Sequence, residues 1–189
     1  MPIQPPNDAS IDTLLGPPRS VLPTAWRTMP WRNGGGRTHE LLKLGESALG
    51  FTLRVSIAEV QADGPFSRFD GVNRALLLLS GAGMTLTWSN GEQTTLTPEA
   101  PLVAFPGEEA PENVLLSGPT TDLNVMTDRA ALSAQVILSP PGPITAPLTL
   151  LLRPAVVGGE ALPALTLLVR AAPALCDAPT AAILLSSCV

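Results

Sequence analysis

Regular alternation of apolar and polar side chains is clearest at residues 51–60. One face of this run carries Phe51, Leu53, Val55 and Ile57, and the other carries Thr52, Arg54, Ser56 and Ala58. A period of two residues places successive side chains on opposite faces of an extended chain. The run therefore predicts a strand with one apolar face and one mixed face, and with Arg54 in its middle.

Shorter runs of the same kind, or fully apolar ones, recur along the chain. They predict strands at 38–44, 74–80, 84–88, 92–96, 102–105, 113–117, 120–127, 132–138, 148–152, 165–169 and 181–185. Asn90-Gly91, between two alternating runs, predicts a tight hairpin because this dipeptide suits a turn with positive φ. Apart from a short helical turn at 11–15, no helical period is sustained. Many short strands separated by Gly and Pro predict an all-β fold, either a closed antiparallel barrel or a sandwich.

The length of 189 residues suits one domain or two small fused barrels. Residues 1–25 are rich in Pro, Asp and Ser and predict a mobile arm, so the folded part is expected at 26–189. Hydrophobic residues make up 45% of the chain and charged residues 14%, which is enough apolar material for a core.

The charge of the chain and the absence of apolar targeting segments exclude several classes of partner and location. The net charge is −5 and no Lys/Arg cluster is present, so the sequence lacks the features of a nucleic-acid-binding protein. No apolar run reaches the roughly 18 residues of a membrane span, and the N-terminus lacks a secretory signal. We expect a cytoplasmic protein with no membrane contact, with Cys176 and Cys188 as free thiols.

Arg54 is the first candidate for a binding role. A guanidinium in the middle of a strand is costly to bury without a partner. Either a protein carboxylate pairs with it as a structural ion pair, or the face lines a pocket and an acidic ligand does so. Arginine suits the second role because its planar fork binds a carboxylate with two hydrogen bonds.

The glycine-rich segment 33–40 is the second candidate. Its three consecutive glycines predict a close approach of backbone or ligand, and their N–H groups are candidates for an anion-binding nest. The alternative is a tight turn without a ligand. In the strand that follows, Thr38 and Glu40 share one face and His39 points to the other, so Asn33, Thr38 and Glu40 are candidate pocket residues.

His39 is the only histidine, so neither a histidine metal site nor a Ser-His-Asp arrangement is predicted, and we expect no metal and no cofactor. A further polar face is formed by Asp122, Asn124 and Met126, where Asp122 is either a pocket group or the structural partner of an arginine. Arg74 opens a buried strand and is either a second cation at a pocket mouth or a strand-end arginine reaching solvent.

Five blocks together resemble the HutD/Ves family of the cupin superfamily. They are Pro30-Trp31-Arg32-Asn33-Gly34-Gly35-Gly36-Arg37-Thr38-His39-Glu40, Arg54–Ala58, Gly64–Phe69, Leu78–Met84 and Gly118–Thr127, and they span about residues 26–130. The resemblance implies one or two cupin-like antiparallel barrels in one chain and no histidine metal triad. The segment Phe69-Asp70-Gly71-Val72-Asn73-Arg74 departs from the family pattern, so Asp70 and Asn73 would alter the ligand if they faced the pocket.

The family resemblance also implies a function. It implies a non-enzymatic protein that binds a small acidic intermediate of histidine degradation, urocanate or N-formylglutamate, and moderates histidine utilisation. The implied ligand-binding residues are Arg54, Asn33, Thr38, Glu40, Ser56, Asp122, Asn124 and Arg74. Two alternatives remain open: an isomerase or hydrolase of a small acid that uses His39 or Glu40, and a stress-related protein-binding regulator. Exposed barrel edges also leave room for a homodimer.

Overall fold

The alternating run at 51–60 forms strand β4 (Leu53–Val60), near the centre of a six-stranded antiparallel sheet. The computed structural model describes residues 9–188, and within it this sheet has the order β2-β3-β4-β11-β6-β9. The other strands are β2 (Arg27–Pro30), β3 (Gly36–Leu44), β6 (Val72–Ser80), β9 (Leu102–Pro106) and β11 (Thr120–Asp128). The period-two pattern therefore located most of the sheet correctly.

A second, smaller sheet covers one face of the first. Its order is β5-β10-β7-β8, with β5 (Gly64–Pro65), β7 (Met84–Thr87), β8 (Gln93–Leu96) and β10 (Glu112–Leu115). The predicted β7–β8 hairpin is confirmed, but only Gly91 has a positive φ, of 84°. The N–H of Gly91 bonds to the Trp88 carbonyl, so the connection is a three-residue loop and not a two-residue type I′ turn.

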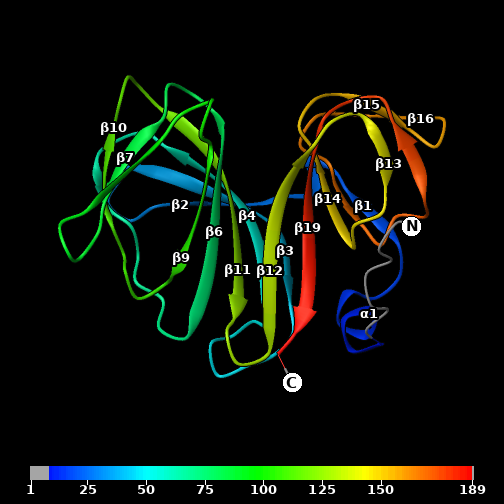
Figure 1. Ribbon diagram of the computed structural model, residues 1–189, viewed down its shortest axis with the longest axis horizontal. Helices are drawn as coiled ribbons and strands as arrows, with labels where there is room; N and C mark the ends of the chain where they lie inside the picture. Colours follow the sequence, from blue (N-terminus) through cyan, green and yellow to red (C-terminus); the bar gives the residue numbers. More distant parts are fainter. Residues whose placement is uncertain (1–8, 189) are drawn as a thin grey trace.

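The C-terminal half repeats this plan with a five-stranded and a four-stranded sheet. The first has the order β1-β17-β14-β19-β12, with β1 (Arg19–Val21), β12 (Leu132–Ser139), β14 (Leu148–Leu151), β17 (Leu167–Val169) and β19 (Thr180–Ser187). The second has the order β13-β18-β15-β16, with β13 (Gly142–Ile144), β15 (Ala155–Val157), β16 (Glu160–Leu162) and β18 (Ala174–Cys176). The two halves lie side by side, with β11, β12 and β19 running through the middle of the molecule (Figure 1).

The six-stranded sheet is buried on both faces. On one face Leu53, Val55 and Ile57 pack into the main core, which also contains Leu148 and Ile183 of the five-stranded sheet. On the other face β4 turns its alternate side chains toward the four-stranded sheet, where Ala58 and Val60 join a second core cluster. The alternation of β4 thus separates a core face from a face that can hold a site.

Residues 9–25 are part of the fold and not a mobile arm, contrary to the sequence-based prediction for residues 1–25. Ile11 and Leu15 of helix α1 (Ala9–Leu15) are buried in the main core. After α1, strand β1 pairs with β17, and the short 3-10 helix η1 (Pro23–Ala25) leads into β2. Apolar burial and a strand ladder hold this segment in place, and residues 1–8 of the predicted arm lie outside the described residues.

The predicted all-β class is confirmed. One or two barrel-like units were predicted, and the described residues form two units of two sheets each. Of the two predicted alternatives, a closed barrel or a sandwich, the described residues show the sandwich, because each unit consists of two separate sheets with no ladder joining them into a ring. Strands such as β5, two residues long, are too short to continue the hydrogen bonding around a barrel. Cys176 and Cys188 are free thiols, as predicted.

Candidate functional site

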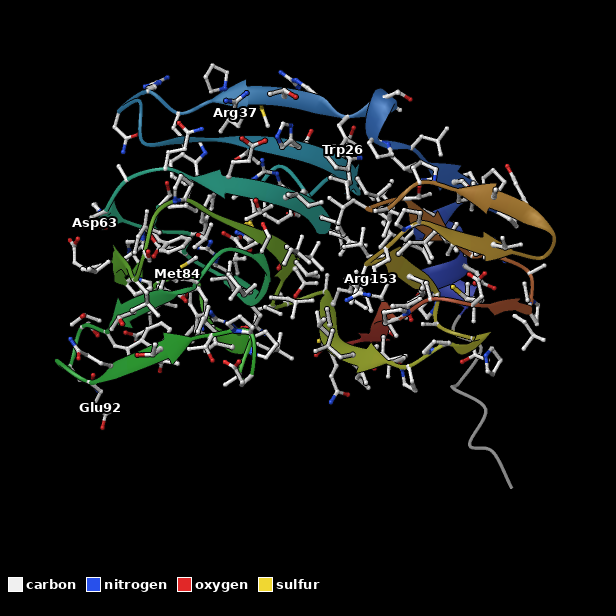
Figure 2. The ribbon with its side chains drawn as sticks, turned by 90° about the horizontal axis from the view of Figure 1, so that it is seen from above. Trp26, Arg37, Asp63, Met84, Glu92 and Arg153 are labelled. Carbon is white, nitrogen blue, oxygen red and sulfur yellow. The ribbon has the colours of Figure 1, made fainter. Side chains whose placement is uncertain are left out.

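A cavity of about 380 Å³ lies between the two sheets of the N-terminal half. Strands β3, β4, β6, β10 and β11 contribute to its wall, as do the glycine-rich loop and the segment 62–69. Its lining residues are Trp31, Arg32, Asn33, Gly35, Thr38, Arg54, Ser56, Ala58, Val60, Ala62, Asp63, Gly64, Pro65, Phe66, Ser67, Phe69, Arg74, Asn113, Asn124 and Met126. Figure 2 shows Asp63 at the end of this half that points away from the C-terminal half.

Arg54 lines the cavity, as predicted, but it already has a protein partner. Its Nε donates to Glu40 Oε2 at 2.8 Å, and both side chains are largely buried. Glu40 itself is not part of the cavity wall; its carboxylate holds Arg54 from the neighbouring strand β3. Of the two alternatives considered for Arg54, the structural ion pair is the one that the structure shows, and this ion pair borders the cavity.

Arg74 is neither a cation at the mouth nor a strand-end side chain reaching solvent. It lines the cavity with only 4% of its surface exposed. Its guanidinium carbon lies 5.3 Å from the ring centre of Phe66, 5.5 Å from that of Phe69 and 5.0 Å from that of Phe105. Its Nη1 donates to the carbonyl of Ser67 at 3.2 Å, whereas its buried Nε has no hydrogen-bond partner among the described residues.

Asp122 is not a lining residue of the cavity, but it lies on the same strand face as the lining residue Asn124. It is fully buried, and neither carboxyl oxygen has a hydrogen-bond partner among the described residues. Burial raises the pKa of this carboxyl to about 7, and the positive charge of Arg74 opposes that rise. Burial likewise lowers the pKa of Arg74 to about 10, opposed by Asp122 and reinforced by Arg54. Among the arginines that the sequence allowed as partners of Asp122, which are Arg54, Arg74 and Arg129, the charge that acts on it is that of Arg74, although the two side chains form no ion pair among the described residues.

Amide and hydroxyl side chains complete the polar lining. Asn33, Thr38, Ser56 and Asn124 line the cavity as predicted, and Thr38 Oγ1 accepts a hydrogen bond of 2.8 Å from Trp31 Nε1. The side-chain oxygens of Asn113 and Asn124 are buried without a partner among the described residues. Sequence reasoning missed Asn113, although an amide that shares one face of β10 with the apolar Leu115 was a detectable signal. It also missed the cage of Phe66, Phe69 and Phe105, which only the tertiary fold assembles.

The glycine-rich loop forms the rim of the cavity and not an anion nest. The N–H of Gly34 bonds to the Trp31 carbonyl and that of Gly35 to Asn33 Oδ1, so both donors are used within the turn. Gly34 adopts a φ of 71°, which favours glycine. A Cβ at Gly36 would clash with the backbone oxygen of Glu59 and lie 3.1 Å from the Trp31 ring. The close approach predicted for this segment therefore involves the protein's own backbone.

His39 lies on the opposite face of the sheet from Thr38, as the alternation predicted. Its Nδ1 is 2.8 Å from Thr28 Oγ1 and its Nε2 is 2.7 Å from Glu59 Oε1, so the imidazole bridges β2 and β4 outside the cavity. Asp70 forms an ion pair with Arg68 at 2.6 Å, and Asn73 accepts a hydrogen bond from Arg129. Asp70 and Asn73 are therefore engaged away from the cavity.

Residues 9–188 contain neither a candidate metal centre nor a candidate membrane-spanning helix. No group of three or more His, Cys, Asp or Glu side chains in this range is placed to hold a metal ion. Within the same residues, no helix combines the length and apolar character needed to cross a membrane.

Comparison of the sequence with known proteins matches residues 24–148 to the family model HutD. An uncharacterised 21.2 kDa protein in the hutC 3′ region of Pseudomonas putida is 39% identical over 99 residues, which cover 52% of each chain. The protein Ves of Citrobacter koseri is 37% identical over 114 residues, which cover 58% of this chain and 59% of the other. The aligned part spans little more than half the length of these relatives.

Solved structures match over more of the chain. The structure of HutD from Pseudomonas fluorescens SBW25 gives a TM-score of 0.80 at 28% identity, and covers 92% of this chain and 100% of the other. A conserved protein of unknown function from Pseudomonas aeruginosa PAO1 gives a TM-score of 0.78 at 28% identity, with 91% and 100% covered. Both halves of the described fold therefore have counterparts in these structures.

Proposed function

We propose a function from the premise that this chain belongs to the HutD family, whose model matches residues 24–148. The resemblance seen in the sequence is thereby confirmed, together with a cupin-like all-β fold. In this proposal, the cavity of the N-terminal half binds a small carboxylic acid reversibly, and the protein acts as a binding protein and not as an enzyme.

The observation that carries the proposal is the buried guanidinium of Arg74. Arginine has five N–H donors in a planar fork that matches a carboxylate. Among the described residues, Arg74 donates to one carbonyl, and the nearest carboxyl group that balances its charge, Asp122, forms no hydrogen bond. A ligand carboxylate in the cavity would supply both the missing acceptors and the missing charge.

The remaining lining supports a ligand with a flat or apolar body. Phe66, Phe69 and Trp31 line the same cavity as Arg74 and offer ring faces or edges to it. Thr38 and Ser56 add hydroxyl groups to the same lining. Binding sites of small molecules typically combine such apolar walls with a few polar groups that fix the orientation.

We propose urocanate and N-formylglutamate as the first candidate ligands and a role in modulating histidine utilisation. The relative from Pseudomonas putida is described as a protein of the hutC 3′ region, and a matched structure is that of a HutD protein. Urocanate has one carboxylate and a planar ring, which suits the aromatic walls. N-formylglutamate has two carboxylates, which suits two arginines on one cavity.

Binding without turnover is favoured by the positions of the two candidate acid–base groups. Glu40 is engaged by Arg54 at 2.8 Å, and His39 lies on the far face of the sheet. General acid–base catalysis requires a group within hydrogen-bond reach of the substrate in the cavity. The alternative of an isomerase or hydrolase predicts that a bound acid is consumed, which the same experiment can follow.

The test is calorimetric titration of the protein with urocanate, N-formylglutamate, glutamate and histidine, with absorbance and chromatography of each acid after incubation. Saturable binding of urocanate or N-formylglutamate, weakened in Arg54→Ala and unchanged in Arg68→Ala, is the expected result. Arg68 is the matched control because it is a surface arginine already paired with Asp70. Consumption of the acid would favour the enzyme, and absence of binding to every acid would contradict the proposed function.

A further inference from the structure

Arg74 and ionised Asp122 carry opposite charges on the same face of the six-stranded sheet, without a direct ion pair between them among the described residues, and they are distinct from the Arg54–Glu40 ion pair. Arg54 is neutralised by Glu40 through a 2.8 Å contact. Arg74 is balanced only by Asp122, whose carboxyl oxygens accept no hydrogen bond among the described residues. The charge that a ligand meets in the depth of the cavity is therefore set by Arg74 and by the protonation state of Asp122.

The surroundings of Asp122 contain few other charges. On the sheet face that carries it, the charged side chains are Arg74 on β6, Arg54 on β4, Glu40 and the exposed Lys43 on β3, the exposed Arg27 on β2, and Asp128 at the end of β11. Arg32 and Asp63 also line the cavity, from the loops beside the sheet. The opposite sheet contributes the amide of Asn113 together with Met84 and Leu86 of the second core cluster. Ala58, directly beside Asp122 in the strand register, is also apolar.

An incoming carboxylate would compete with Asp122 for the same buried cation. Two carboxylates close to one cation, in surroundings of low polarity, repel each other strongly, and one of them then retains a proton. The ligand carboxylate gains the hydrogen bonds of the guanidinium fork, whereas Asp122 has no hydrogen bonds that favour its ionised form. The proton therefore goes to Asp122.

We propose that the depth of the cavity is a proton-linked carboxylate site, in which a ligand carboxylate binds to Arg74 and Asp122 takes up one proton from solvent. This inference rests on the proposed function, in which Arg74 is the anchor, and adds Asp122 as the specificity-determining residue. No covalent bond forms or breaks; the only transfer is that of a proton from buffer to the Asp122 carboxyl.

The linkage has a definite sign. Burial raises the pKa of Asp122 to about 7, so the ligand-competent protonated form predominates below that pH. If only this form binds the ligand, affinity is constant in the acid range and falls about tenfold between pH 6 and pH 8. Proton uptake per bound ligand is then about 0.9 at pH 8 and close to zero at pH 5.5.

The experiment is calorimetric titration at pH 5.5 and pH 8, in two buffers of different ionisation enthalpy at each pH. The probes are N-formylglutamate and 3-(2-furyl)acrylate, a ring analogue of urocanate that, like N-formylglutamate, has no titrating group in this pH range. Asp122→Asn places an uncharged side chain of the same shape at the buried position. At both pH values we expect this variant to bind with the affinity that the wild type shows at pH 5.5, and to take up no proton. Asp128→Asn is the matched control, because Asp128 ends the same strand and accepts a hydrogen bond from Ala130 outside the cavity.

The outcomes separate this inference from the proposed function. Proton uptake in the wild type and in Asp128→Asn, but not in Asp122→Asn, is the expected result. Binding without proton uptake, or pH-dependent affinity that persists unchanged in Asp122→Asn, would overturn the inference and leave the proposed function standing. Absence of binding to both probes at both pH values would overturn both.

Discussion

Replacing Arg74 with methionine tests whether the buried guanidinium serves the ligand or the fold. Methionine keeps a long, flexible side chain that can remain between Phe66, Phe69 and Phe105. The substitution removes the positive charge and the single hydrogen bond to the Ser67 carbonyl. It therefore separates the packing of Arg74 from its charge.

The expected loss of ligand affinity is large. Removing one partner of a buried charge pair costs about 2–5 kcal/mol, which corresponds to an affinity loss of roughly 30-fold to several thousandfold. The equivalent change at Arg54 should cost less, because Glu40 already neutralises that guanidinium. Calorimetric titration of Arg74→Met and Arg54→Ala with the same acid measures both losses.

The stability of the fold should change much less than the affinity. Burial lowers the pKa of Arg74 to about 10, which means that burying the charged guanidinium costs free energy in the folded protein. Replacing a buried ion by an apolar side chain is often neutral or stabilising, provided that the partner is also neutralised. At pH 6 Asp122 can protonate, and we expect the unfolding free energy of Arg74→Met to lie within about 1–2 kcal/mol of the wild type.

The control is Arg68→Met, since Arg68 is 61% exposed and lies on the same segment outside the cavity. It should bind the acid as the wild type does. A folded Arg74→Met variant, shown by urea denaturation and circular dichroism, that binds the acid within twofold of the wild type would refute the reasoning.

Three further predictions concern Asp122, the glycine-rich loop and Glu40. Because the pKa of Asp122 is raised from 3.8 to about 7 in the folded protein, its contribution to stability is greatest below pH 4 and is lost as the pH rises toward 7. Asp122→Asn should remove this loss, which amounts to about 2.5 kcal/mol of unfolding free energy between pH 5 and pH 8, as measured by urea denaturation at these two pH values; equal pH dependence in both proteins would contradict it. Gly36→Ala should lower the free energy of unfolding by about 2 kcal/mol or more, because the added Cβ clashes with the Glu59 backbone. Gly34→Ala should lower it by about 1 kcal/mol, because Gly34 has a positive φ. Thermal unfolding measures both losses, and a larger loss in Gly34→Ala would refute the comparison. Glu40→Gln should tighten binding of the acid by about three- to tenfold by freeing Arg54, and weaker binding would show that Glu40 orients Arg54 for the ligand.

The sequence was most informative where a strand is long and its two faces differ. The alternation of residues 51–60 separated Leu53 and Val55 from Arg54 and Ser56, and the structure places the first two in the core and the other two on the cavity. Because side chains alternate along a strand, assigning the apolar side chains to one face also assigns the polar side chains to the other face. An error of one residue would have exchanged the two faces. The same reasoning assigned Thr38 and His39 correctly to opposite faces of β3.

The sequence was least informative where function depends on contacts between distant segments. Arg74 lies in a run that is apolar on both faces, so no alternation indicates which way its side chain points. Its cage unites Phe66 and Phe69 of a loop with Phe105 of β9, and its charge is balanced by Asp122 of β11. These contacts arise only when the strands are ordered in the sheet.

The N-terminal segment shows the same limit for the fold. Its Pro-rich composition is typical of a mobile arm, yet β1 pairs with β17, almost 150 residues further along the chain. A strand of three residues carries too little alternation to be recognised, and its stability comes from the ladder and from the burial of Ile11 and Leu15 beneath it. Local pattern therefore underestimated how much of the chain is folded.

The most direct test of the central claim is a crystal structure of the protein grown with the acid that binds best in calorimetry. The account predicts that the ligand occupies the cavity of the N-terminal half, with its carboxylate within hydrogen-bond distance of the Arg74 guanidinium and its body against Phe66 and Phe69. A ligand bound elsewhere on the chain, or one in the cavity whose carboxylate makes no contact with Arg74, would contradict the account.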